Sequence, residues 1–234
     1  MAENEQGRPS VRLLRVLVGP GRVFQEVVAE PAFIRPALAV CGVSLVLGIV
    51  LAPRVRAFTT WVLQHGPANV PPEQAEQVLR AAPTVAVAGS VATAVVAPWF
   101  VWLVVAGLLK LYAMFTAREA ALKALFAVAV YGYLPILIGN GLTTVLLLGV
   151  PVENFQRVSL SLAAFLPFQK GFIYFFLSKC SPFTWWSLVL WGAGGAAAIK
   201  TRPGGVTAYL FALWLAEALA LAAAASLNTP AGLG

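Results

Sequence analysis

The chain has 234 residues, of which 60% are hydrophobic and only 11% are charged, whereas an average soluble domain carries about 25% charged residues. A soluble chain this apolar could not cover its own surface, and its apolar residues gather into blocks of about 20, long enough to span the hydrocarbon core of a bilayer. The formal net charge is +7 and the basic residues flank the apolar blocks, which favours anionic lipid headgroups over nucleic acid as their partner.

Residues 1–35 are predicted to form a cytoplasmic amphipathic arm that precedes a membrane domain over residues 36–234. Two short helical patterns lie in this arm on either side of Gly19 and Pro20. Each has one apolar face, made by Val11, Leu14 and Val18 in the first pattern and by Val23, Phe24 and Val27 in the second. Both are too short and too charged to cross a bilayer. Two placements stay open: at the cytoplasmic membrane interface, or against the protein's own cytoplasmic loops.

Five apolar blocks predict five transmembrane helices, at residues 36–52, 84–109, 122–149, 182–199 and 206–227. Residues 53–83 are expected to form a loop that contains a short charged helix over 73–80. The turn over residues 200–205 is short and basic, so the last two spans should form an antiparallel hairpin. The predicted fold class is therefore all-α, a polytopic bundle of membrane helices.

Residues 160–178 are apolar and aromatic enough to be a sixth span. However, a proline, a glutamine, a lysine and a glycine lie near their middle, at Pro167, Gln169, Lys170 and Gly171. A charge is most costly at the centre of a bilayer. We therefore expect an amphipathic interfacial or re-entrant element here rather than a span.

The distribution of lysine and arginine predicts the orientation, because cytoplasmic loops carry the excess of these residues. Of the 16 basic residues, ten lie in the N-terminal arm, in the segment between the second and third spans and in the last turn, against six on the other side. The N-terminus is therefore expected in the cytoplasm and the C-terminus outside.

Glu217 is the acidic residue nearest the middle of a predicted span, about ten residues from either end of 206–227. An ionised carboxylate at that depth is costly unless it is paired or protonated, so we expect it to face the interior of the bundle. Two interpretations stay open. Glu217 belongs to a proton- or cation-responsive site or a substrate path, or it is a structural group that links helices by hydrogen bonds.

The third span offers partners for such a group. Tyr133, Asn140 and Thr144 are spaced by seven and four residues, hence on one helix face. Ser90 and Thr93 of the second span are further polar candidates. Two prolines are predicted helix break points, because each removes a backbone donor: Pro135 leaves the carbonyl of Tyr131 without its usual partner, and Pro98 does the same for Ala94. Ordinary hydrogen bonding between helices is the simpler interpretation for the Ser and Thr residues.

The sequence has no pattern that indicates catalysis. It contains one histidine, His65, no aspartate, and two cysteines that the predicted topology keeps apart, which is too few ligands for a metal site. Neither a nucleophile elbow nor a glycine-rich phosphate loop is present. We expect no enzyme activity and no cofactor. The expected partners are membrane lipids, a second copy of the chain or another membrane protein.

Three features resemble the Yip family of membrane proteins, also called Ypt/Rab-interacting or YIPF proteins. The segment from Pro20 to Pro31 precedes the first span, and Gly132, Tyr133 and Pro135 in the third span are similar to the Gly-Tyr…Pro motif of that family. The five-span layout, with Pro182-Phe-Thr-Trp185 leading into the fourth span, is also similar. The resemblance covers about residues 15–227. The Asp-Leu-Tyr-Gly-Pro motif of the eukaryotic members is absent, so the chain looks more like the prokaryotic branch.

The resemblance implies a non-enzymatic integral membrane protein that acts through lipid or protein contacts, in membrane organisation or trafficking. In a prokaryote it would reside in the plasma (inner) membrane. The alternative interpretation is a small transporter, channel or lipid-moving protein with Glu217 in its pathway and the two proline breaks beside a binding site.

Overall fold

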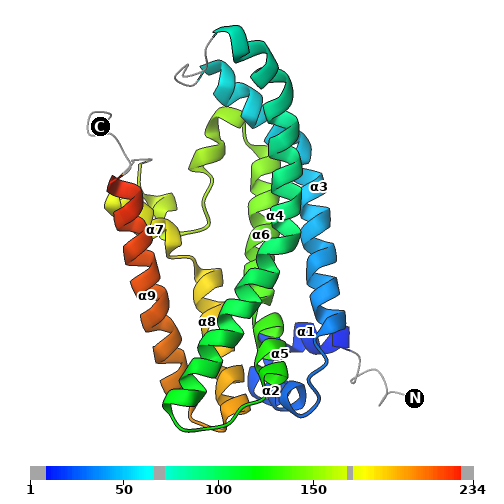
Figure 1. The fold of residues 1–234 in the computed structure, drawn as a ribbon, viewed down its shortest axis with the longest axis vertical. Helices are drawn as coiled ribbons and strands as arrows, with labels where there is room; N and C mark the ends of the chain where they lie inside the picture. Colours follow the sequence, from blue (N-terminus) through cyan, green and yellow to red (C-terminus); the bar gives the residue numbers. More distant parts are fainter. Residues whose placement is uncertain (1–8, 66–71, 168–170, 228–234) are drawn as a thin grey trace.

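The computed structural model describes residues 9–65, 72–167 and 171–227, and every regular element in these segments is a helix (Figure 1). The arm forms α1 (Pro9–Val18) and α2 (Pro20–Ala29). The long helices are α3 (Ile34–His65), α4 (Pro72–Phe115), α5 (Leu122–Gly132), α6 (Leu134–Gly149), α8 (Pro182–Ile199) and α9 (Pro203–Leu227). Three short helices, η1 (Val152–Arg157), η2 (Leu162–Phe165) and α7 (Phe172–Lys179), lie between α6 and α8. The predicted all-α fold is confirmed.

Four helices are long and apolar enough to cross a membrane, at Ile34–His65, Glu76–Phe115, Leu122–Gly149 and Pro203–Leu227. They coincide with four of the five predicted spans. The remaining predicted span is α8, which has 18 residues and is rich in tryptophan and glycine, residues of low hydropathy. Ten of its side chains or glycines are buried inside the bundle.

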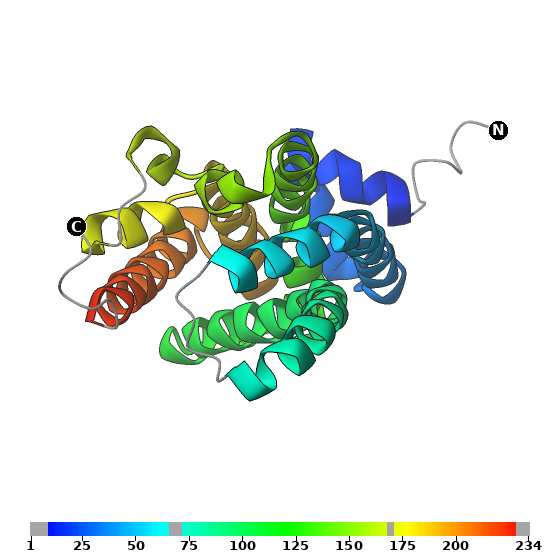
Figure 2. The same ribbon diagram turned by 90° about the horizontal axis from the view of Figure 1, so that it is seen from above.

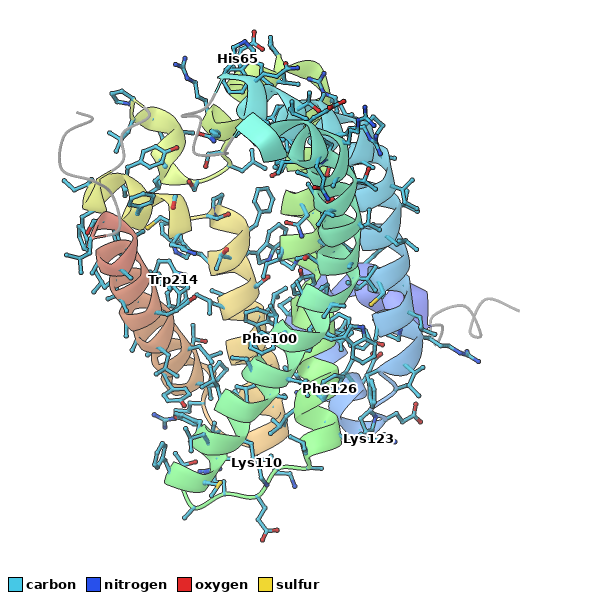
Figure 3. All side chains as sticks on the ribbon, turned by 45° about the horizontal axis from the view of Figure 1, so that its top comes forward. His65, Phe100, Lys110, Lys123, Phe126 and Trp214 are labelled. Atoms are coloured by element: carbon cyan, nitrogen blue, oxygen red, sulfur yellow. The ribbon has the colours of Figure 1, made fainter. Side chains whose placement is uncertain are left out.

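Successive passages of the chain run in opposite directions along the long axis of the bundle, and α5 and α6 together form one passage (Figure 1). We call the end that carries α1 and α2 the arm end, and the end that carries η1 and η2 the loop end. Helix α8 contacts α2, α4, α5, α6 and α9, and the view along the bundle places it in the interior (Figure 2). Lys110 and Lys123 lie at the arm end and His65 at the loop end (Figure 3).

The predicted loop over residues 53–83 is helical where it is described, and the predicted short helix over 73–80 is part of α4. Helix α3 continues through Pro53 to His65, and α4 begins at Pro72; residues 66–71 lie outside the described residues. The extension of α3 is held at the loop end by Arg54, whose guanidinium donates to the carbonyls of Leu147 and Val150, and by Phe58, whose ring stacks on Phe155 at 5.3 Å. Tertiary contacts thus prolong a helix that a proline was expected to end.

Within residues 160–178 the described elements are η2, with four residues, and α7, with eight. A spanning helix needs about 20 residues, so neither crosses. Residues 168–170 of the predicted interfacial or re-entrant element lie outside the described residues. Helix α7 packs against α9 and η2.

The arm packs on the protein itself through α2, as in the second of the two open placements, but α2 contacts the helices α5 and α8 rather than loops. Val23, Phe24 and Val27 are all buried. A Cβ added at Gly194 of α8 would lie 2.7 Å from the Phe24 ring and 2.6 Å from Val128 of α5. The Phe24 ring therefore occupies a space between α8 and α5 that exists only because residue 194 has no side chain.

Candidate functional site

The third span is interrupted at the family-like motif. Tyr133 separates α5 from α6, with φ −76° and ψ −14°. Its backbone N–H donates to the carbonyl of Val130 at 3.3 Å, which is the tighter i to i+3 pattern. Pro135 occupies the first turn of α6, where a missing N–H is tolerated. The predicted break at Pro135 is therefore present.

The predicted break at Pro98 is wrong. Helix α4 runs from Pro72 to Phe115 without interruption, with Pro83 and Pro98 inside it. Spanning helices tolerate an internal proline when neighbouring groups satisfy the released carbonyl.

Gly132 provides the space for a tryptophan from the central helix. A Cβ at this position would lie 2.2 Å from Cδ1 of Trp191, far inside van der Waals contact. The Trp191 indole Nε1 donates to the carbonyl of Ala129 at 2.9 Å, which is the carbonyl that the Tyr133 N–H would bond in a regular helix. The break in the helix thus frees an acceptor, and α8 supplies its donor.

Tyr133 is buried among aromatic rings. Its ring meets that of Trp102 edge to face, with centroids 6.0 Å apart, and its side chain lies near that of Asn140. Trp99 of α4 donates through Nε1 to the Cys41 sulfur at 3.1 Å, and Cys41 lies near Tyr133. Tyr133 therefore lies between an aromatic cluster and Asn140.

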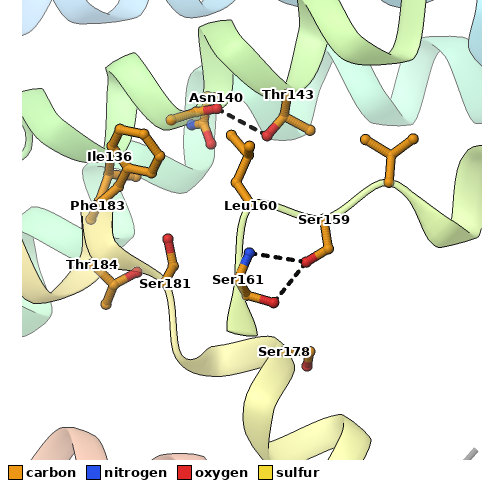
Figure 4. A pocket seen from close by; sticks show the side chains of 12 residues that line it. Ile136, Asn140, Thr143, Ser159, Leu160, Ser161, Ser178, Ser181, Phe183 and Thr184 are labelled. Carbon is orange, nitrogen blue, oxygen red and sulfur yellow. Dashed lines mark hydrogen bonds between the residues drawn. The ribbon is translucent and has the colours of Figure 1, made fainter. Parts of the chain in front are cut away.

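Asn140 opens onto a cavity of about 260 Å³ near the loop end (Figure 4). Its walls come from α6, from the segment between η1 and η2, and from the α7–α8 junction. The polar lining consists of Asn140, Thr143, Ser159, Ser161, Ser178, Ser181 and Thr184. The Phe183 ring packs so closely on α6 that a Cβ at Gly139 would lie 2.9 Å from it. The cavity is thus rich in hydroxyl groups, and none of its lining residues is charged. We call it the headgroup cavity.

The loop segment is fixed beside the headgroup cavity by its own hydrogen bonds. The Ser159 and Ser161 hydroxyls are 2.7 Å apart, and the backbone N–H of Leu162 donates to the carbonyl of Cys180 at 3.0 Å. The same segment borders a neighbouring cavity of about 400 Å³, lined by Arg157, Ala163, Ala164, Leu166, Pro167 and Tyr174. Arg157 lines this cavity and directly precedes Val158, which lines the headgroup cavity.

A second polar cavity, of about 230 Å³, lies between α3, α4 and α6. We call it the Ser44 cavity. Its polar lining is Ser44, Ser90, Asn140, Thr143 and Thr144, and its apolar lining includes Leu47, Leu51 and Leu147. Asn140 and Thr143 line both cavities, so α6 presents polar groups to each.

The structure brings together several of the predicted polar residues. Asn140, Thr144 and Ser90 meet at the Ser44 cavity, and Tyr133 lies near Asn140. Thr93 is exposed and lines none of the three cavities. Sequence reasoning missed Ser44 and Thr143, as well as the loop and α8 hydroxyls. Their positions in the sequence carried no periodic signal that relates one element to another.

The expectation that Glu217 faces the interior of the bundle is wrong. Its side chain is exposed on α9, and in the described chain it has no hydrogen bond or ion pair. The buried side of α9 is formed by Val206, Leu210, Ala218 and Ala222. Glu217 lines none of the three cavities, so it does not join the polar residues of the third span.

These sites suit the binding of uncharged, hydrogen-bonding groups. Among the described residues no group of three or more His, Cys, Asp or Glu could hold a metal ion. Hydroxyl and amide side chains both donate and accept hydrogen bonds, and pockets of this kind fix the orientation of a ligand through a few polar groups.

Comparison with curated proteins and with solved structures gave no match. The family model for the Yip1 domain matches residues 14–225. This range begins inside α1 and ends in α9, so it includes α2, the break at Tyr133, both polar cavities and the central helix α8. The match extends over nearly the whole chain and agrees with the Gly-Tyr-Leu-Pro motif seen in the third span, and the chain is therefore a member of the Yip1 domain family.

Proposed function

We propose that this protein is a non-enzymatic component of the membrane that acts by binding a polar lipid, with the lipid headgroup in the headgroup cavity. The observation that carries the proposal is an uncharged, hydroxyl-lined cavity at the loop end of an apolar bundle. A lipid can reach the cavity from the bilayer beside it, and its headgroup offers hydrogen-bonding groups to the hydroxyl lining.

The neighbouring cation supports a phospholipid in particular. Arg157 immediately precedes Val158, which lines the headgroup cavity, and Arg157 itself lines the cavity of about 400 Å³. A guanidinium is well suited to a phosphate because it offers planar, charge-assisted hydrogen bonds. The hydroxyl groups would then receive the uncharged part of the headgroup or the glycerol.

The proposed topology places this site in the outer half of the membrane. Helix α8 is proposed as the fifth span, because 18 residues extend about 27 Å, close to the thickness of the hydrocarbon core. The excess of basic residues at the arm end supports a cytoplasmic arm. The site would then serve the organisation of the membrane through lipid contact. With Glu217 exposed and outside the cavities, no observation favours the transport alternative.

The test is the lipid retained by the full-length protein after extraction in a mild detergent, identified by mass spectrometry. The double variant Ser178→Ala, Thr184→Val removes two hydroxyls that line only the headgroup cavity. We expect it to lose bound phospholipid about three- to tenfold, as the loss of one or two hydrogen bonds implies. Arg157→Gln should reduce the retention of phospholipid but not that of an uncharged glycolipid.

The matched control is Thr60→Val, Ser226→Ala, because both hydroxyls donate to their own helix backbone, as Ser178 does, and neither lines the cavity. Equal retention by the wild type, the control and the cavity variant would place the lipid elsewhere. A wild-type protein that retains no phospholipid would end the proposal.

A further inference from the structure

The Ser44 cavity contains a buried hydroxyl without a partner. The Ser44 side chain is 5% exposed, and its Oγ has no hydrogen bond to any described residue. An unpaired buried hydroxyl is unfavourable because the group has lost its bonds to water. A molecule inside the cavity that bonds to Ser44 would remove this cost.

The other hydroxyls show which kind of group the cavity accepts. Ser90 donates to the carbonyl of Val87, Thr143 to that of Gly139 and Thr144 to that of Asn140, each at 2.9 Å. Since their hydrogens are used inside their own helices, these three oxygens offer only lone pairs to the cavity. The site therefore favours a ligand that donates hydrogen bonds.

The depth of the cavity requires an uncharged ligand. Ser44 is the central residue of the predicted span 36–52, about 12 Å from either end at 1.5 Å per residue. None of the residues that line the cavity is charged, and an ionised group is strongly disfavoured at this depth without a partner. A phosphate or an ammonium group is thus excluded, and a hydroxyl group satisfies both requirements.

The remaining walls suit a hydrocarbon chain. Leu47 and Leu51 of α3 and Leu147 of α6 complete the lining, and α3 and α4 meet closely at Gly48, where an added Cβ would lie 3.4 Å from the Cβ of Ala94. We propose that the Ser44 cavity binds the hydroxyl end of an uncharged, long-chain lipid alcohol that enters from the bilayer. This goes beyond the headgroup cavity, because it involves a different cavity and a ligand without phosphate.

The test measures binding of radiolabelled oleyl alcohol to the full-length protein in a mild detergent, after rapid desalting. We expect the wild type to retain the alcohol and Ser44→Ala to weaken retention about three- to tenfold, as the loss of one hydrogen bond implies. Ser44→Thr keeps the hydroxyl and should restore binding, which separates recognition from damage to the fold. Oleyl methyl ether, which cannot donate, and oleate, which is charged, should compete poorly.

Ser187→Ala is the matched control. Ser187 is also a fully buried serine whose hydroxyl has no partner in the described chain, but it does not line the cavity. Wild-type protein that retains no alcohol, equal binding of the methyl ether, or equal losses in Ser44→Ala and Ser187→Ala would overturn the proposal. Displacement of the bound oleyl alcohol by glycerol, at a concentration similar to that of the alcohol, would mean that the cavity binds a small polyol. That result would overturn the proposal of a lipid alcohol. The variants Ser178→Ala and Thr184→Val leave this cavity intact, so either proposal can fail without the other.

Discussion

At the residue scale, the family-like motif fixes the packing of α5 and α6 against α8. Gly132 makes room for the Trp191 ring, and the break at Tyr133 frees the Ala129 carbonyl for the Trp191 indole. Pro135 fixes the start of α6 just beyond the break. Each residue of the motif thus has a separate structural role, and two of these roles position Trp191.

Gly132→Ala should destabilise the protein by about 1–3 kcal/mol, because the added methyl group overpacks a closely packed site. The control is Gly141→Ala in α6, where an added Cβ meets nothing within 4 Å and alanine favours the helix. Thermal unfolding in detergent measures both. A Gly132→Ala protein as stable as the Gly141→Ala protein would show that Trp191 can move aside without cost.

Trp191→Phe should cost about 1–3 kcal/mol more than Trp102→Phe, because it leaves the Ala129 carbonyl without its donor. Trp102 is fully buried, but its Nε1 has no partner in the described chain, so its replacement removes an unpaired group. Both changes delete the same atoms from a buried position. Equal losses in denaturation experiments would mean that the hydrogen bond to Ala129 contributes little.

At the element scale, α2 packs against α5 and α8 at the arm end of the bundle. Its apolar face is short, but Gly194 of α8 and Val128 of α5 leave room for the Phe24 ring to pack between them. The preceding helix α1 is attached more loosely, with Leu14 and Val18 exposed although Val16 is buried. Most of the stabilisation of the arm therefore comes from α2, and from Phe24 in particular.

Phe24→Ala should cost about 3–5 kcal/mol, as expected for the removal of a buried aromatic ring, and should make the arm more susceptible to limited proteolysis. Phe115→Ala is the control, because the Phe115 side chain is 74% exposed and its loss removes little packing. Proteolysis patterns that are identical in the two variants would mean that α2 stays docked without its ring.

At the scale of the whole molecule, the central position of α8 explains its composition. Helix α8 contacts α2, α4, α5, α6 and α9, and most of its residues are buried against them. Small residues at such contacts let the helices approach closely. Its glycines serve different neighbours: an added Cβ would meet Thr207 at Gly192 and Leu109 at Gly195. The bundle is thus built around a helix whose small residues allow its neighbours to pack closely.

The topology predicts that cysteines placed before residue 9 react with membrane-impermeant reagents only from the cytoplasm, and that cysteines at Lys179 and near the C-terminus react only from outside. The background is Cys41→Ala, Cys180→Ala. Burial raises the pKa of the Cys180 thiol, so less thiolate is present at neutral pH and this cysteine would otherwise label slowly. Labelling of Lys179 and of the C-terminus from the cytoplasm would make residues 160–178 a span and require a sixth crossing.

The sequence by itself determined the class of protein, four spans confirmed by the helices, and one polar face. These follow from local rules: a bilayer needs about 20 consecutive apolar residues, and residues spaced by three, four or seven share a helix face. Asn140 and Thr144 could be predicted for this reason. The break at Pro135 was also accessible, because the effect of proline on a backbone donor is local.

Only the tertiary structure decided which helix faces point inward and what meets at each cavity. Helix α9 is apolar on all sides, so no sequence pattern shows which of its faces is buried, and the chain places Glu217 on an exposed face. Ser44, Ser90 and Thr143 come from three helices and become neighbours only when α3, α4 and α6 pack together. The physical reason is that an apolar side chain in a membrane can face either lipid or protein at similar cost. Which side chains are buried therefore depends on close packing between helices, and the hydrophobicity of the sequence does not show this.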